Sequence, residues 1–156
     1  MDKIKFGGKR FGNIKRGYYN INGKKLFFRS AWEANYALYL DFLINNKKIQ
    51  SWEYEADVFI FDKIKFGTRS FRPDFKLLNN DNSIEYHEIK GYMDSQSKTK
   101  LNRMKMYYPG IKIRVVGSRE YNQLKRQLSF VMCATQNMGQ AIEDLKGLWK
   151  RGSIAT

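Results

Sequence analysis

The chain has 156 residues, with 29 Lys and Arg against 15 Asp and Glu, which gives a formal net charge of +14. This charge indicates a polyanion as partner, and it favours nucleic acid over a membrane surface. This length suits a single compact domain, and the lone Cys133 excludes both an internal disulfide and a cysteine metal cluster. No signal-peptide pattern and no apolar run of membrane-spanning length occurs, so we expect a cytoplasmic protein without a membrane partner.

The first 29 residues predict a basic arm followed by a small ribbon. Residues 1–17 combine cations with four glycines, which indicates a flexible arm whose Lys9 and Arg10 are candidates for contacting a phosphate backbone. An ordinary disordered terminus remains the alternative. In residues 18–29, Asn22-Gly23 separates two β-forming segments, which is the strongest short-range hairpin signal, so we expect a β-ribbon there.

Ser30 is expected to begin a helix that runs to about Asn45. Ser30-x-x-Glu33 matches a capping box, and the cap is one interpretation of Glu33. At 100° per residue, however, Glu33 falls within the apolar arc of the helix, which comprises Trp32, Tyr36, Ala37, Leu40, Leu43 and Ile44. Because a buried carboxylate is costly unless it is paired or bound to metal, a site residue is the second interpretation, and we favour it.

Residues 49–62 alternate regularly and predict one strand with a wholly apolar face. A basic, glycine-containing connection at 63–68 leads from it into a hairpin over 72–92, whose turn is centred near Asp81. With that turn, Asp74 lies opposite Glu88, give or take one residue, at a Cα separation of roughly 4.5–5.5 Å.

The period of two in the second strand of this hairpin assigns its side chains to faces. Glu88 and Lys90 share one face with Ile84 and Tyr86, whereas Glu85, His87 and Ile89 point the other way. A direct catalytic role for His87 is therefore disfavoured. Tyr92 either packs or stacks near the site, and the sequence does not choose between these.

The remaining segments predict two helices that flank a strand, and then a final helix. A helix begins at Asp94 or Ser95 and ends near Tyr108, IKIRVV forms a strand, and further helices cover Ser118 to about Cys133 and residues 140–149. The first of these helices has an apolar stripe of Ser97, Leu101, Met104 and Tyr108 and an outer set of cations, Lys98, Lys100, Arg103 and Lys105. Such a cation set is usually a solvated face, but its position after the carboxylate strand favours phosphate contact for some members.

The carboxylates of Asp74 and Glu88 can share a hard divalent cation, with the carbonyl of Ile89 and waters completing its coordination. Mg²⁺ fits best and Mn²⁺ is expected to substitute, because one histidine and no cysteine cluster give zinc little to bind. Lys90 can orient the attacking water and offset charge on a phosphoryl group. The alternative is an ordinary Glu88–Lys90 surface salt bridge. The candidates for DNA contacts are Arg69, Arg72, Lys98, Lys100, Lys9 and Arg10.

Over about residues 28–117, the sequence resembles the PD-(D/E)xK nuclease superfamily. The resemblance lies in Pro73-Asp74, in Glu88-Ile89-Lys90 on the next strand, in a preceding helix with Glu33, and in the αβββαβ order. The segments RSAWEANYALYLDFL, SWEYE, RSFRPDF and EIKGYMDSQSKTKLNRM are similar to small phage-type nucleases related to Holliday-junction resolvases of the endonuclease I kind. The resemblance implies that Asp74 and Glu88 bind metal, that Lys90 is the catalytic lysine, and that Glu33 is an additional carboxylate able to reach a second metal. It also implies a homodimer that cuts branched DNA, in the cytoplasm of a bacterial host if the chain is phage-encoded.

The expected fold is therefore α/β, with a restriction-endonuclease-like αβββαβ core and a mixed central sheet. We expect one nuclease domain over 1–156, with its catalytic core at 30–117 and C-terminal helices at 118–156. The expected function is Mg²⁺-dependent hydrolysis of phosphodiester bonds in branched DNA such as Holliday junctions. Two alternatives stay open: a sequence-specific endonuclease of homing or restriction type, and a non-catalytic DNA-binding module.

Overall fold

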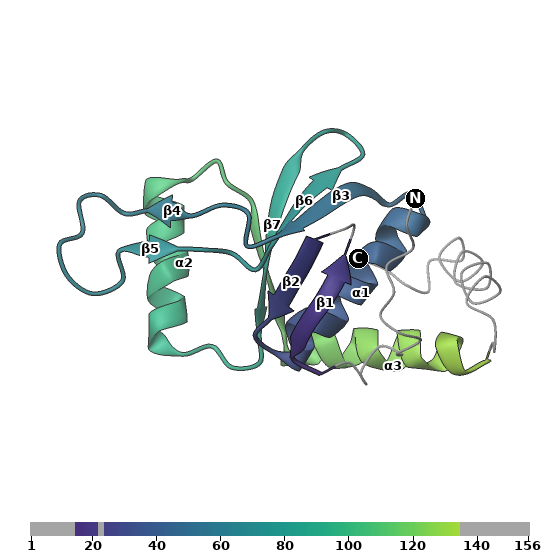
Figure 1. Cartoon of the computed structure of the whole chain (residues 1–156). Helices are drawn as coiled ribbons and strands as arrows, with labels where there is room; N and C mark the ends of the chain where they lie inside the picture. The colour runs from purple at the N-terminus through teal and green to yellow at the C-terminus, as the bar shows by residue number, and fades with distance from the viewer. Residues whose placement is uncertain (1–14, 22–23, 135–156) are drawn as a thin grey trace. The chain divides into compact units, whose positions relative to one another are not determined.

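The computed structural model describes residues 15–21 and 24–134, and within them the protein is a mixed α/β structure with three helices and eight strands (Figure 1). The chain divides into two compact units. The first consists of residues 1–48 together with 119–156, and the second of residues 49–118. Each unit is considered by itself below. The predicted helix at 140–149 and most of the predicted basic arm, including Lys9 and Arg10, lie outside the described residues.

The first unit contains the predicted ribbon and two helices. Strands β1 (Gly17–Ile21) and β2 (Lys24–Phe28) pair antiparallel, which confirms the ribbon expected at 18–29. Helix α1 (Ala31–Asn45) begins after the N-cap Ser30, as predicted, and α3 covers Ser118–Ala134. The ring of Trp32 on α1 stacks on that of Tyr121 on α3, with centroids 4.1 Å apart. Aromatic stacking therefore joins the two helices of this unit.

A four-stranded sheet with the order β3-β6-β7-β8 forms the centre of the second unit. Its strands are β3 (Ile49–Tyr54), β6 (Phe75–Asn79), β7 (Ile84–Lys90) and β8 (Ile113–Gly117). The first two pairings are antiparallel and β7 pairs with β8 in parallel, so the sheet is mixed, as expected. Helix α2 (Ser95–Tyr107), capped by Asp94, makes the crossover that a parallel pair requires.

The single strand predicted over 49–62 is wrong. Strand β3 ends at Tyr54, and the next residue, Glu55, takes a left-handed backbone conformation with φ 49°. The chain then forms a separate two-stranded sheet, β4 (Phe59–Ile60) with β5 (Ser70–Phe71). We call residues 59–71 the β4–β5 hairpin.

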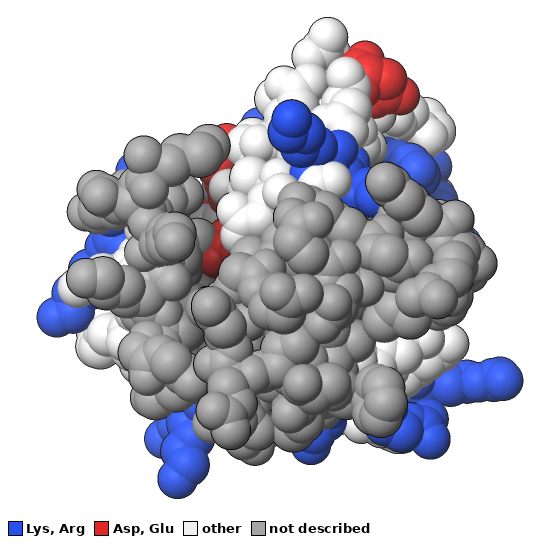
Figure 2. All heavy atoms as spheres, turned by 90° about the vertical axis from the view of Figure 1, so that its right-hand side faces the viewer, with Lys and Arg blue, Asp and Glu red and all other residues white. Residues whose placement is uncertain are grey.

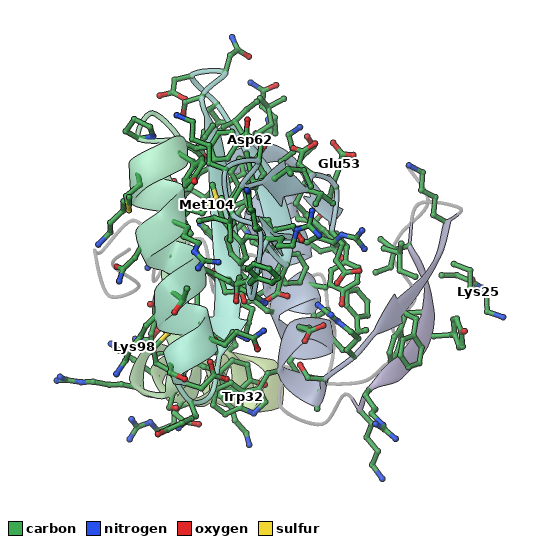
Figure 3. All side chains as sticks on the ribbon, turned by 90° about the vertical axis from the view of Figure 1, so that its left-hand side faces the viewer. Lys25, Trp32, Glu53, Asp62, Lys98 and Met104 are labelled. Atoms are coloured by element: carbon green, nitrogen blue, oxygen red, sulfur yellow. The ribbon has the colours of Figure 1, made fainter. Side chains whose placement is uncertain are left out.

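Burial of aromatic side chains accounts for this departure from the predicted strand. Phe61 and Phe71 of the β4–β5 hairpin form a buried cluster with Met104 of α2, and Leu101, Tyr107 and Tyr108 pack against it. In Figure 3 Met104 points from α2 toward the strands. A continuous strand would place Phe59 and Phe61 on its more polar face, whereas the hairpin gives both a partly or fully buried position against α2.

No helix among the described residues combines the length and the apolar character needed to cross a membrane. Lys and Arg side chains project at several separate places on the face of the molecule that Figure 2 presents.

Candidate active site

Asp74 and Glu88 face each other at one end of the central sheet. Phe75 on β6 pairs with His87 on β7, so the residue before Phe75 lies across from the residue after His87. Both carboxylates are buried, with Asp74 4% and Glu88 6% exposed. The predicted juxtaposition of Asp74 and Glu88 is confirmed, and it follows from antiparallel pairing around the predicted turn.

The backbone of β7 orients Asp74. The amide N–H of Ile89 donates a hydrogen bond of 2.7 Å to Oδ2 of Asp74. The carbonyl of Asp74 in turn accepts from the amide N–H of Glu55 at 2.8 Å. Asp74 is therefore held between two neighbouring segments, and a carboxylate fixed in this way is suited to a role that depends on position.

Glu88 has one engaged and one unengaged carboxylate oxygen. Nζ of Lys90 lies 3.4 Å from Oε1. Oε2 is buried and has no hydrogen-bond partner among the described residues. Burial raises the pKa of Glu88, and Lys90, the backbone of Asp74 through a hydrogen bond, and the charge of Lys100 oppose that rise. A buried carboxylate oxygen without a hydrogen-bond partner is costly to a fold, and Oε2 is therefore available to a cation or another donor.

Lys100 borders this pair of carboxylates from α2. Its charge acts both on Glu88 and on Asp94, the residue that caps the helix. Lys90 acts on Asp94 as well, so the first turns of α2 lie next to the end of β7. Lys98 is exposed, and Figure 3 shows it at the outer surface of α2. Of the two lysines proposed for phosphate contacts on this helix, Lys100 is the one near the carboxylates.

The two predicted arginine contacts lie on the segment that leads into β6. Arg72 is 54% exposed in its side chain, and its Nη1 lies 3.9 Å from a carboxylate oxygen of Glu55. Arg69 is also exposed, and its carbonyl accepts a hydrogen bond from the amide of Phe61. Both side chains are therefore accessible to a large ligand.

Glu33 belongs to the first unit and makes the contacts of a helix cap. Oγ of Ser30 accepts from the Glu33 amide at 3.1 Å and donates to Oε1 at 2.9 Å. The Arg29 amide donates to Oε2 at 3.2 Å. Glu33 is nevertheless buried, 8% exposed, as its place in the apolar arc predicted. The cap interpretation is thus confirmed, and its role as a metal ligand stays a prediction.

His87 and Glu88 are consecutive residues of β7, so His87 lies on the opposite sheet face, as the period of two predicted. Its Nε2 lies 3.1 Å from Oε1 of Glu85, and Nζ of Lys112 lies 2.9 Å from the other oxygen of Glu85. Burial lowers the pKa of His87 to about 4, so the ring is neutral at neutral pH. This group forms a separate polar network away from the carboxylate pair.

A second polar group was missed from the sequence. Tyr86 and Lys76 form a cross-strand pair on the same face as Asp74 and Glu88, and both contact Asp57. The Tyr86 hydroxyl donates to Oδ2 of Asp57 at 2.5 Å, and Nζ of Lys76 lies 2.8 Å from the same oxygen. No local signal could have found this contact, since Asp57 reaches the pair only because the chain leaves the sheet after Tyr54.

Comparisons of the chain with models of protein families, with curated proteins and with solved structures give no match. The described residues contain no group of three or more His, Cys, Asp and Glu side chains placed to hold a metal ion. The candidate site in the second unit therefore consists of Asp74 and Glu88 with Lys90 and Lys100 beside them.

Proposed function

We propose that this protein is a Mg²⁺-dependent DNA endonuclease with a restriction-endonuclease-like core, acting on branched DNA such as a Holliday junction. The observation that carries the proposal is the buried pair of Asp74 and Glu88 on adjacent strands, with Oε2 of Glu88 unengaged and Lys90 on the same face. The sheet strands and helices follow one another as α1, β3, β6, β7, α2 and β8, with the β4–β5 hairpin inserted. That order agrees with the αβββαβ core of the PD-(D/E)xK superfamily, which the motifs resemble.

The residues present fit a hard divalent cation. Mg²⁺ is commonly held by one or two carboxylates, with water and substrate phosphate as its other ligands, so a pair of carboxylates is sufficient. The unengaged Oε2 of Glu88 and the oriented Asp74 would supply the protein ligands. When bound, the cation would stabilise negative charge on the phosphoryl group and assist deprotonation of water.

The chain's own residues would perform the other parts of the reaction. The Ile89 amide keeps Asp74 in one orientation. Lys90, with its side chain 30% exposed, can turn from Glu88 toward an incoming phosphate and offset developing charge. Lys100 adds a second positive charge beside Glu88. The net charge of +14 favours approach of the DNA backbone.

A cleavage panel tests the proposal. Four-way junction, flap, plain duplex and single strand are incubated with the full chain, with and without Mg²⁺ or Mn²⁺. The proposal expects metal-dependent cleavage, fastest on the junction. Asp74→Asn and Lys90→Ala should abolish cleavage while junction binding persists, and Glu53→Gln, which changes an exposed glutamate of β3, should cleave normally.

Three results point away from the proposal. Retained cleavage in Asp74→Asn or Lys90→Ala would remove these residues from the reaction. Cleavage of one linear duplex at a unique site, with indifference to junctions, would indicate a sequence-specific endonuclease. Binding without cleavage of any substrate in either metal would indicate a DNA-binding module.

A further inference from the structure

The tip of the β4–β5 hairpin exposes an aromatic ring. Phe66 is 85% exposed, more than any other large hydrophobic side chain in the described part of the chain. Gly67, the next residue, has φ +75°, a conformation that other residues rarely adopt, so the turn that presents Phe66 depends on glycine. An aromatic ring held in water forgoes the gain of burial, which makes it a candidate for contact with a ligand.

The base of the hairpin is fixed, so Phe66 projects from an ordered support. The Phe61 amide donates to the carbonyl of Arg69 at 2.8 Å, and the Tyr108 hydroxyl donates to the carbonyl of Ile60 at 2.7 Å. Arg103 of α2 also donates to the carbonyl of Thr68. Together with the buried cluster of Phe61, Phe71 and Met104, these contacts tie both strands to α2. A held aromatic group loses little conformational entropy on binding.

The charges around Phe66 select the kind of ligand. Lys63, Lys65 and Arg69 are all exposed, whereas Asp62 is the single acidic side chain between residues 59 and 71. Cations beside an exposed aromatic ring match a single-stranded nucleic acid, whose phosphates meet the cations while a base stacks on the ring. Every base has a π-face, so such contact needs no particular sequence.

The hairpin is also close to the carboxylate pair along the chain. Phe66 precedes Asp74 by eight residues, so a fully extended chain limits the distance between them to about 28 Å. This upper limit on the distance equals the length of about eight nucleotide steps of one DNA strand. A base that contacts Phe66 therefore belongs to the DNA near the phosphate at the carboxylates.

We infer that the tip of the β4–β5 hairpin is a binding site for an unpaired base of DNA, with Phe66 as the stacking surface and Lys63, Lys65 and Arg69 as contacts to the flanking phosphates. The inference rests on the proposed function and deepens it, because it names unpaired bases near the cleaved bond as the feature recognised. Branch points and flaps supply such bases, and continuous duplex does not.

The test measures binding of the full chain, in EDTA, to a roughly 12-nucleotide mixed-sequence strand and to an abasic strand of the same length. Fluorescence anisotropy gives the dissociation constants. Phe66→Ala should weaken binding to the base-bearing strand about tenfold and leave the abasic strand unchanged, because loss of one stacked base costs about that factor or more. Phe66→Trp should keep the wild-type affinity. Met106→Ala, which truncates another exposed side chain (77% exposed) on α2, should change neither dissociation constant.

Three outcomes overturn the inference. Phe66→Ala could bind the base-bearing strand as tightly as the wild type, or it could lose the same affinity for both strands. It could also lose affinity only for vesicles of phosphatidylserine and phosphatidylcholine. The last would assign the tip to an anionic lipid surface. Melting curves of each variant verify folding, which an exposed position should leave intact.

Cleavage by the same wild-type preparation separates the two proposals. If no metal-dependent cleavage occurs but binding of the strand depends on its bases and on Phe66, the proposed enzyme fails and the base site stands. If cleavage occurs and Phe66→Ala binds both strands like wild type, the enzyme stands and the base site fails.

Discussion

Glu88 combines burial, an unengaged oxygen and a lysine neighbour at a single position. Its side chain is 8% exposed, Nζ of Lys90 lies 3.4 Å from Oε1, and Oε2 has no hydrogen-bond partner among the described residues. A residue selected only for stability would not bury a half-satisfied carboxylate, because the desolvation of charge is poorly repaid there. Such local cost is typical of residues retained for function.

Glu88→Gln should separate stability from activity. The substitution keeps the size of the side chain and removes the buried charge. In EDTA we expect a free energy of unfolding equal to or up to about 1 kcal/mol above that of the wild type, because the cost of burying the charge is removed. Cleavage should fall by at least about a hundredfold, and Mg²⁺ should no longer raise the melting temperature.

Urea denaturation, calorimetric melting with and without Mg²⁺, and junction cleavage provide the readouts for Glu88→Gln. Glu53→Gln is the matched control, since it removes an exposed carboxylate from β3. A variant that still gained stability from Mg²⁺ would show that the cation binds without Glu88.

Lys100 differs from the other cations of α2 in its effect on the carboxylate pair. Lys100→Ala should reduce cleavage by about tenfold, less than the loss of a group in direct contact with the phosphoryl oxygens. Lys105→Ala, an exposed position toward the end of the same helix, should leave cleavage unchanged. Single-turnover cleavage rates, measured at a saturating concentration of junction DNA, separate a slower reaction from weaker binding. Equal rates in Lys100→Ala and Lys105→Ala would contradict the prediction.

For single residues, the sequence predicted the sheet face on which a side chain lies better than it predicted the hydrogen bonds that the side chain makes. The period of two along IEYHEIK correctly placed Glu88 and Lys90 on one face and His87 on the other, because strand geometry alone determines this. The hydrogen bond from the Ile89 amide to Asp74 depends on the three-dimensional meeting of two strands and left no trace in the sequence. The same holds for the pairing of Asp57 with Tyr86.

Among the elements, the hairpin strands and helix α2 were predicted with nearly correct ends. Asp94 is an N-cap with a recognisable sequence signal, and the Asn and Asp residues at 79–82 indicate a turn wherever they occur. The break after Tyr54 was not predicted because the alternation continues through Glu55. Packing of aromatic side chains on α2 and the contact of Asp57 with Tyr86 both favour the turn there. Both are tertiary interactions, which a local sequence pattern does not reveal.

The contact of Asp57 with β6 and β7 should make the stability of the fold depend on pH. Hydrogen bonds from Lys76 and from Tyr86 lower the pKa of Asp57 in the folded protein. The ionised carboxylate therefore stabilises the fold above its unfolded pKa of about 3.9, and this contribution is lost as pH falls through the lower folded pKa. Asp57→Asn should lower the free energy of unfolding at about pH 7, and its deficit should shrink below about pH 4.

Urea denaturation of wild type and Asp57→Asn over this pH range checks the prediction. Asp62→Asn, an exposed position in the β4–β5 hairpin, serves as the control and should show no deficit at either pH. A deficit of constant size down to about pH 3 would mean that the charge of Asp57 is not what stabilises the fold.

The molecule as a whole carries a formal charge of +14, and this predicts how DNA binding responds to salt. With six or more cations at phosphates, affinity for a plain duplex in EDTA should fall by about 10³-fold or more between about 50 and 200 mM salt. Two duplexes of unrelated sequence should give equal slopes, because backbone contacts do not depend on sequence. Anisotropy titrations measure this, and a fall of less than about tenfold would argue against a polyanion as partner.

The segment that carries the β4–β5 hairpin leaves and rejoins the sheet at almost the same point. Tyr54 pairs with Phe75, and the Glu55 amide bonds to the carbonyl of Asp74, so residues 55–74 leave β3 and return to β6 across a single hydrogen-bonded step. A segment closed in this way can be lengthened or shortened at its tip while the sheet keeps its register, since its ends are already joined. The turn around Phe66 and Gly67 is thus the part in which length and sequence can change most freely, while the contacts of Asp57, the buried cluster with Met104 and the position of Asp74 are kept.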